Sequence, residues 1–384
     1  MPRRHLAALT GLLALGLATT LAAEDRVGPA DPPRVQIAIL LDTSGSMQGL
    51  IEQAKTHLWK IVNTFATARR DGVAPAFEVA LYEYGNDGLD GREGYIRQIV
   101  PLTTDLDKVS EELFKLTTNG GSEFCGHVIQ TATRELSWSP AGGDYKAIFI
   151  AGNEPFTQGT VHYADACKAA ITRGIIINTI HCGGYDQGVE GKWLDGAQLA
   201  DGSYSHIDQN QTVVHIPAPQ DDELATLNAQ FNKTYVAYGQ EAEEAQARQV
   251  AQDAAASKLS GGVLMQRIQA KGGANYRNAQ WDLVDASKEE GFDITTVKDA
   301  DLPEELRGKS ADEKKAYVEA KATERAELQA KIKDLSQARE AYVAAERKKL
   351  AEAAGDQAEA SLDDAILGAV RKQLTDKAYT FEKQ

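Results

Sequence analysis

The stretch AILLDTSGSMQG, residues 38–49, places one carboxylate and two hydroxyls at the end of an apolar run. Asp42, Ser44 and Ser46 are separated by single residues, so their side-chain oxygens can gather at one loop. Hard oxygen donors of this kind suit Mg²⁺, Mn²⁺ or Ca²⁺ and not a metal that seeks thiolates. Asp and Ser are also common helix caps, so Asp42 and Ser44 could instead cap the helix that follows.

A cation held by this loop would keep part of its positive charge. Only one of the three side chains is a carboxylate, which leaves a dication under-neutralised, with ligand positions for water. An acidic side chain of a protein partner could take such a position. The loop therefore indicates a metal-dependent contact with another protein.

The elements around this loop predict an α/β fold with a doubly wound, mostly parallel sheet. Between residues 35 and about 233, short β-branched runs alternate with segments of helical periodicity. The run at residues 35–42 is apolar throughout, as expected of a central strand. In an open sheet of this class, ligands bind beyond the carboxyl ends of the strands, where Asp42, Ser44 and Ser46 lie.

The other elements follow in alternating order. We expect an antiparallel edge pair of strands and several buried strands, separated by amphipathic helices, with a last helix that closes the sheet. The expected strands are 77–85, 95–103, 145–153, 174–184 and 204–208, and the expected helices are 50–65, 105–116, 126–136, 163–173 and 219–231.

The strand, loop and helix around DTSGS resemble the von Willebrand factor type A domain family and its metal-ion-dependent adhesion site. The resemblance covers residues 34 to about 235, and we place the domain at residues 34–238. In that family a Thr or Ser after a pair of glycines is a further ligand. The segment TTNGGSEFCG matches, which implies that Ser122 has this role here.

The third element of the family's motif is different in this chain. The family often has an Asp before a Gly at the end of the fourth strand, whereas this chain reads IFIAGNEPF, with Gly152 at the place of that Asp. Asn153 or Glu154 could take over, directly or through water. The alternative is a domain that keeps the loop but has lost tight metal binding.

Residues 239–384 differ in composition from the segment before them. The stretches 239–260 and 309–377 are rich in Ala, Glu, Lys, Gln and Arg, which favours long exposed helices. Leu328, Ile332 and Leu335 follow coiled-coil spacing, so we expect a helical hairpin or a weak coiled coil, with parts disordered. A second hypothesis for function is a metal-free scaffold that interacts or self-associates through these helices.

The N-terminal sequence predicts export. Residues 1–23 have two arginines, an apolar stretch and small residues before a cluster of acids, as in a secretory signal peptide. The alternative, a membrane anchor, would need a longer apolar run. Cleavage leaves 39 Lys and Arg against 56 Asp and Glu, a formal charge of −17. We therefore expect a periplasmic or secreted protein that does not bind nucleic acid or insert stably into a membrane.

The cysteines suggest a third hypothesis. Cys125, Cys167 and Cys182 allow one disulfide at most, and the sequence does not choose the pair. Cys125 begins a predicted helix beside the proposed cation site, where the helix dipole could lower the pKa of a thiol. A catalytic thiol also needs a base, and His127 would point away from Cys125 on a helix. A cysteine-dependent enzyme is therefore the least favoured of the three hypotheses.

Overall fold

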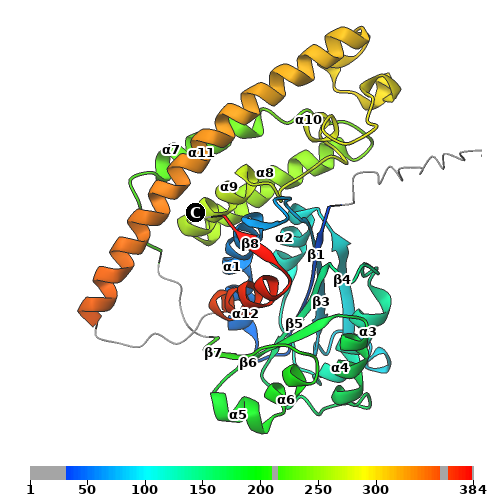
Figure 1. The fold of residues 1–384 in the computed structure, drawn as a ribbon, viewed down its shortest axis with the longest axis vertical. Helices are drawn as coiled ribbons and strands as arrows, with labels where there is room; N and C mark the ends of the chain where they lie inside the picture. The colour runs from blue at the N-terminus through cyan, green and yellow to red at the C-terminus, as the bar shows by residue number, and fades with distance from the viewer. Residues whose placement is uncertain (1–31, 210–214, 355–361, 383–384) are drawn as a thin grey trace, which may run out of the picture. The chain divides into compact units, whose positions relative to one another are not determined.

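A central sheet of six strands organises the chain (Figure 1). The structure is a computed structural model and describes residues 32–209, 215–354 and 362–382, so the predicted signal peptide at residues 1–23 lies outside the described residues. The strand order is β4-β3-β1-β5-β6-β7, and only β4 runs antiparallel to its neighbour. The strands of this sheet are β1 (Arg34–Asp42), β3 (Ala76–Tyr84), β4 (Ile96–Thr103), β5 (Tyr145–Gly152), β6 (Ile176–Cys182) and β7 (Tyr204–Ile207).

The predicted α/β fold with a mostly parallel sheet is confirmed. β1 and β5 lie in the middle and are buried along nearly their whole length, which explains their continuous apolar sequences. β3 and β4 form the predicted antiparallel pair at one edge. Each expected strand forms, with ends that differ by one or two residues.

Helices cover both faces of the sheet. One face packs against α3 (Cys125–Glu135), α4 (Tyr163–Thr172) and α6 (Trp193–Gln198). The other packs against α1 (Gln48–Ala66) and α2 (Leu106–Lys115). The short helix α5 (Tyr185–Glu190) precedes α6. These helices cover the faces of the sheet, and the connecting loops lie at the carboxyl ends of the parallel strands.

The helix at residues 219–231 forms but does not close the sheet, so that part of the prediction is wrong. α7 (Asp221–Asn232) packs against the later helices α9 (Gly261–Gly272) and α11 (Ala311–Ala354) instead. Its buried residues Leu224, Leu227 and Phe231 show the expected helical spacing, but periodicity alone does not say which surface an apolar stripe covers.

A helix from the far end of the sequence covers the sheet in its place. α12 (Leu362–Asp376) packs on α1, β6 and β7, and β8 (Tyr379–Phe381) pairs antiparallel with β2 (Ala68–Arg70). The amide of Gln373 on α12 is buried and bonds to both Tyr145 and Asn178. α12 therefore covers the central sheet, while β8 and β2 form a separate two-stranded sheet.

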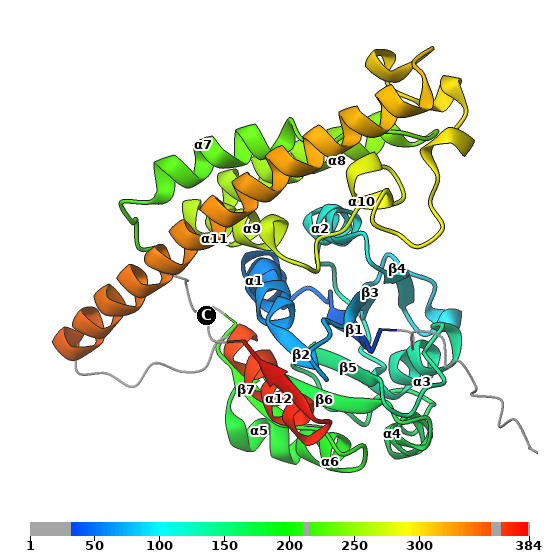
Figure 2. The ribbon, with the colours of Figure 1, turned by 45° about the horizontal axis from the view of Figure 1, so that its top comes forward.

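The remaining helices form a further layer on the side of α1 and α2 (Figure 2). α9 contacts α1, and α8 contacts α2. The long helix α11 lies across α7 and α9, and Leu328 and Ile332 of the predicted coiled-coil seam are buried in the same apolar core as the strands. The helices of this layer, besides α7, are α8 (Ala242–Leu259), α9 (Gly261–Gly272), α10 (Leu283–Ala286) and α11 (Ala311–Ala354).

The connector after α9 is packed against the rest of the protein, since Tyr276 and Trp281 are both buried. Among the described residues, no helix has the length and apolar character needed to cross a membrane.

Candidate cation site at the carboxyl end of the sheet

Asp42 is the last residue of β1 and is fully buried. Its Oδ1 accepts a hydrogen bond of 2.8 Å from the backbone N–H of Ser44, which turns the chain into the loop. Its Oδ2 is buried and has no hydrogen-bond partner among the described residues, and the same holds for the hydroxyl of Ser44. Two oxygen acceptors of the predicted site are thus buried without a protein donor.

Asn153 joins this loop from the end of β5. Its Nδ2 donates to the hydroxyl of Ser46 at 3.2 Å, while its Oδ1 is a further buried acceptor with no partner in the described part of the chain. Ser46 itself is exposed. The structure therefore places Asn153 from the end of β5 next to the loop that carries Asp42, Ser44 and Ser46 after β1.

The loop that carries Ser122 is tied to the same place. The N–H of Asn119 donates to the Thr43 carbonyl at 3.0 Å, and the N–H of Asp87 donates to the Gly120 carbonyl at 2.8 Å. Gly121 has a φ of 148°, and any side chain there would overlap the Gly85 carbonyl. The glycine pair thus allows the loop to pass close to Gly85, and it brings Gly120 and Glu123, on either side of half-buried Ser122, next to the DTSGS loop.

Glu154 is held by neighbours outside the loop. Its carboxylate accepts a hydrogen bond of 3.3 Å from Gln158, and its backbone carbonyl accepts one of 2.9 Å from the Trp193 indole N–H. The side chain of Glu154 is only partly buried. Of the two predicted substitutes for the missing Asp, Asn153 contacts the DTSGS loop and Glu154 bonds to Gln158.

Gly152 leaves no room for the carboxylate that the family often has there. A Cβ at this position would lie 2.5 Å from the Tyr84 hydroxyl and 3.0 Å from Asp42 Oδ2. The Tyr84 hydroxyl is fixed by donating to the Ala151 carbonyl at 3.0 Å. The departure at Gly152 is therefore matched by a tyrosine that fills the same space.

Glu123 is a site residue that sequence reasoning missed. It is 6% exposed, and together with Asp42 and Ser44 it surrounds Gly85. A Cβ on Gly85 would lie 2.9 Å from Asp42 Oδ1 and 3.0 Å from Glu123 Cγ. Its position directly after Ser122 was a sequence signal for this role. That signal was weak, because most acidic residues in such an acidic chain are exposed to solvent.

The electrostatics of the site are unfavourable without a cation. Burial raises the pKa of Asp42 to about 7, against the opposing effect of the hydrogen bond from the Ser44 backbone, and the nearby charge of Glu123 raises it further. Burial and the charge of Glu154 also raise the pKa of Glu123. In the described part of the chain, neither Asp42 nor Glu123 forms an ion pair with a basic side chain.

These residues fit a hard divalent cation. The buried acceptors without donors are one carboxylate oxygen, one hydroxyl and one amide oxygen, which is the oxygen chemistry that Mg²⁺, Mn²⁺ and Ca²⁺ prefer. Within residues 32–209, 215–354 and 362–382, no three His, Cys, Asp or Glu side chains form a metal-binding group. Any site here therefore depends on hydroxyl and amide oxygens as well as carboxylates.

Cys125 lacks the exposure and the lowered pKa of a reactive thiol. Cys125 is fully buried, with its Sγ 3.8 Å from the Tyr84 hydroxyl, and burial raises the pKa of its thiol well above the usual value. A raised pKa disfavours the nucleophilic thiolate, opposite to the lowering considered for this position. All three cysteines are buried free thiols in the structure.

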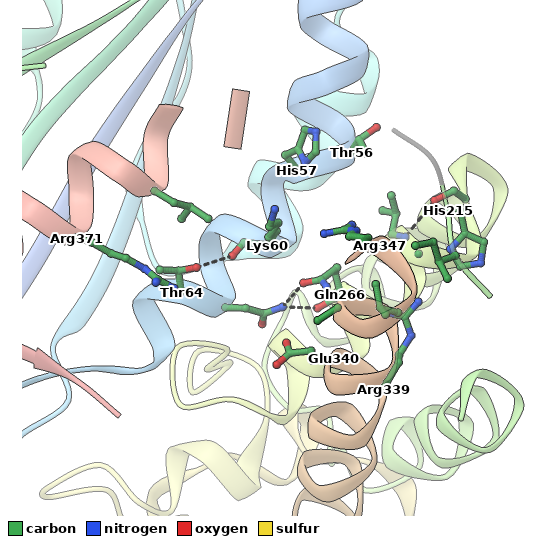
Figure 3. A pocket seen from close by; sticks show the side chains of 18 residues that line it. Thr56, His57, Lys60, Thr64, His215, Gln266, Arg339, Glu340, Arg347 and Arg371 are labelled. Atoms are coloured by element: carbon green, nitrogen blue, oxygen red, sulfur yellow. Dashed lines mark hydrogen bonds between the residues drawn. The ribbon is translucent and has the colours of Figure 1, made fainter. Parts of the chain in front are cut away.

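A separate cavity of about 290 Å³ lies between α1, α9, α11 and α12, away from the cation loop (Figure 3). Lys60, Arg347 and Arg371 line it together with Glu340. Arg339 in its wall is paired with Asp221 at 2.6 Å. This cavity marks the junction between the sheet's helices and the added helical layer.

The comparisons with known proteins agree with the fold. Residues 36–206 match the family model of the von Willebrand factor type A domain. No curated protein matches the chain.

Among solved structures, BatB of Bacteroides thetaiotaomicron is 20% identical over 45% of this chain and 90% of that one, with a TM-score of 0.35. An aerotolerance-related membrane protein of Bacteroides fragilis is 19% identical over 46% of this chain and 93% of that one, with a TM-score of 0.32. The VWA domain of SpRpn10 is 16% identical over 48% of this chain and all of that one, with a TM-score of 0.34.

Proposed function

Residues 36–206 form a von Willebrand factor type A domain, and from that premise we propose that this protein binds a protein partner through a divalent cation held at the DTSGS loop. Domains of this family mediate protein–protein interaction. Asp42, Ser44, Ser46 and Ser122 would hold the cation, with Asn153 as a further oxygen donor. Mg²⁺ is the first candidate, with Mn²⁺ and Ca²⁺ as alternatives.

The observation that carries the proposal is the set of buried acceptors without donors. Asp42 Oδ2, Ser44 Oγ and Asn153 Oδ1 are all buried and have no hydrogen-bond partner in the described residues. A buried polar atom left unsatisfied costs about 1–3 kcal/mol, so three at one loop are unfavourable unless something binds them. A bound dication supplies the positive charge that these oxygens lack.

The cation would also supply the contact to the partner. Ser46 is exposed and Ser122 is half-buried, so the loop opens to solvent on that side. An acidic side chain of the partner could approach there and complete the coordination. We further propose that the protein is exported, on the basis of the N-terminal sequence, and acts in the periplasm or outside the cell.

The experiment is thermal unfolding of the whole protein in EDTA and in millimolar Mg²⁺, Mn²⁺ or Ca²⁺, beside Asp42→Ala. A cation that binds only the folded state adds about 2.7 kcal/mol of stability at a hundredfold excess over its Kd. The proposal expects a rise in melting temperature for the parent and none for Asp42→Ala. An equal rise in both would place the cation elsewhere, and no rise in either would overturn the proposal.

The second candidate is a scaffold that interacts through α11. Tyr342 and Leu350 on this helix are exposed large apolar side chains, 37% and 56% respectively. Self-association through this face would make the apparent mass depend on protein concentration and not on EDTA. Sedimentation of the parent and of a Tyr342→Ser, Leu350→Ser double variant would distinguish this function from the cation-dependent one.

A further inference from the structure

We propose that Glu123 provides the second carboxylate of the cation site, in place of a residue at the end of β5. This inference rests on the proposed cation binding and identifies the residue that balances the charge. A dication bound to Asp42 alone would remain under-neutralised. Glu123 would supply the missing negative charge from a different loop.

The end of β5 cannot supply that carboxylate. A side chain on Gly152 would meet the Tyr84 hydroxyl at 2.5 Å and Asp42 Oδ2 at 3.0 Å. Tyr84 is fully buried and bonded to Ala151, so it cannot swing away without losing that bond. Any second carboxylate must therefore enter from another direction.

Glu123 enters from the loop on the other side of Asp42. Asp42 Oδ1, Glu123 Cγ and Ser44 Cβ all lie within 3.7 Å of the place where a Cβ of Gly85 would stand. Gly85 has a φ of 81° and lacks a side chain, and this is what leaves the space for both acids. The two carboxylates thus share one small region at the end of β1.

The backbone of Glu123 is fixed at both ends. Its N–H donates to Gln158 Oε1 at 3.3 Å, and its carbonyl accepts from the N–H of Cys125 at 3.1 Å. The same Gln158 donates its Nε2 to Glu154. Gln158 therefore positions Glu123 and at the same time occupies the carboxylate of Glu154, which favours Glu123 as the ligand.

The charges around Glu123 point to a cation. Glu123 interacts electrostatically with three other acids, Asp42, Asp87 and Glu154. No Lys, Arg or His forms an ion pair with Glu123 among the described residues. Nearby Glu83 is also buried, yet it is paired with Arg97 at 2.5 Å and accepts from the Thr43 hydroxyl at 3.1 Å. A buried carboxylate normally has a basic partner of this kind, and Glu123 forms no ion pair among the described residues.

The test is calorimetric titration of the whole protein with Mn²⁺, comparing the parent with Glu123→Gln. We expect the affinity to fall at least about tenfold in Glu123→Gln, because ligand charge sets the affinity of such sites. Asp87→Asn is the matched control, since Asp87 is an exposed acid beside the same loop and its change should alter the affinity less than about threefold. Thermal unfolding in EDTA checks that each variant folds.

Two outcomes would overturn this inference and leave cation binding in place. In the first, Glu123→Gln binds Mn²⁺ as tightly as the parent while Asp42→Asn does not bind. In the second, Glu154→Gln loses the affinity and Glu123→Gln keeps it, which would assign the second carboxylate to Glu154. If the parent itself binds neither Mn²⁺ nor Mg²⁺, the proposed function fails together with this inference.

Discussion

Two groups of buried acids in this protein differ in whether a basic side chain lies beside them. In the helical layer and on the neighbouring α2, Asp107, Asp253 and Asp282 each form an ion pair with an arginine or a lysine. The pairs are Asp107 with Arg267 at 2.6 Å, Asp253 with Arg267 at 2.6 Å and Lys271 at 2.9 Å, and Asp282 with Arg325 at 2.6 Å.

At the carboxyl end of the sheet the situation is reversed. Asp42 and Glu123 are also buried, but neither has a basic partner in the described part of the chain. The pKa values of one acid from each group, Asp253 and Asp42, differ in direction. Burial would raise the pKa of Asp253, but the charges of Lys271 and Arg267 outweigh it and hold the pKa well below the usual range, whereas burial raises the pKa of Asp42 to about 7.

Buried charge therefore has a different role in each of the two regions. A pair built into the chain fixes how helices pack, and removing one partner leaves an uncompensated charge. An acid without a built-in partner weakens the metal-free protein but leaves a place for a mobile cation. Stability and binding are thus assigned to separate sets of acids.

The largest effect should come from breaking a built-in pair. Arg325 lies 4.0 Å over the Tyr235 ring, and it bonds Asp282 through both terminal nitrogens. Arg325→Met leaves Asp282 buried and unpaired, so we expect a loss of about 3–5 kcal/mol in the free energy of unfolding, measured in urea. Arg92→Met, which removes an exposed pair with Asp90, should cost less than about 1 kcal/mol. Similar losses in both variants would contradict the comparison.

The same substitution should have opposite signs in the two regions. In EDTA at pH 8, Asp253→Asn should lower the free energy of unfolding by about 2–3 kcal/mol, because charged hydrogen bonds to Lys271 and Arg267 are lost. Asp42→Asn should raise the free energy of unfolding, because it removes a buried charge that has no basic partner. Chemical denaturation of both variants measures the two signs. A loss of stability in Asp42→Asn would mean that Asp42 is satisfied within the protein.

Restoring the family's usual acid should harm the site. Gly152→Asp places a side chain against the Tyr84 hydroxyl, and overpacking of this kind costs about 1–3 kcal/mol. The double variant Gly152→Asp, Tyr84→Phe should regain part of that stability, since the closest contact is gone. Thermal unfolding of the three proteins tests this. If Gly152→Asp were as stable as the parent, the space would be large enough for a carboxylate.

Proton competition at Asp42 should give a smaller effect. Its pKa is raised to about 7, so the contribution of protonated Asp42 to the stability of the metal-free protein should be fully present at low pH and be lost as the pH rises through about 7. Cation affinity should change in the opposite direction and be about tenfold weaker at pH 6 than at pH 8, because a proton occupies Asp42. Titration with Mn²⁺ at the two pH values measures this, and an affinity that does not change with pH would count against Asp42 as a ligand.

Much of the fold and part of the site follow from sequence. Apolar runs and helical periodicity predicted the sheet, its antiparallel edge and the loop that holds Asp42 and Ser44. Tyr84 was missed because its place beside Gly152 depends on strand register, in which Asp42 pairs with Tyr84 on β3. Glu123 was missed because nothing in the sequence separates a buried acid from a solvated one.

The positions of the helices were harder to foresee. Helices α7 and α12 each have one apolar face. Only tertiary packing decides that the face of α12 covers the sheet while that of α7 packs near α11. Arg325 is buried although it lies in the stretch 309–377, which was predicted to form exposed helices, and Arg267 is buried in α9. Their burial depends on acids more than forty residues away in sequence.

The return of α12 to the central sheet affects how a newly made chain matures. The apolar side chains Ile366, Val370 and Leu374 form one wall of a core that also contains residues of the strands, of α1 and of the helical layer. A chain still under synthesis lacks this wall and keeps apolar surface exposed, the condition in which chaperones and proteases act. Chains that stop before residue 362 should therefore be removed by proteolysis, so that only full-length molecules accumulate.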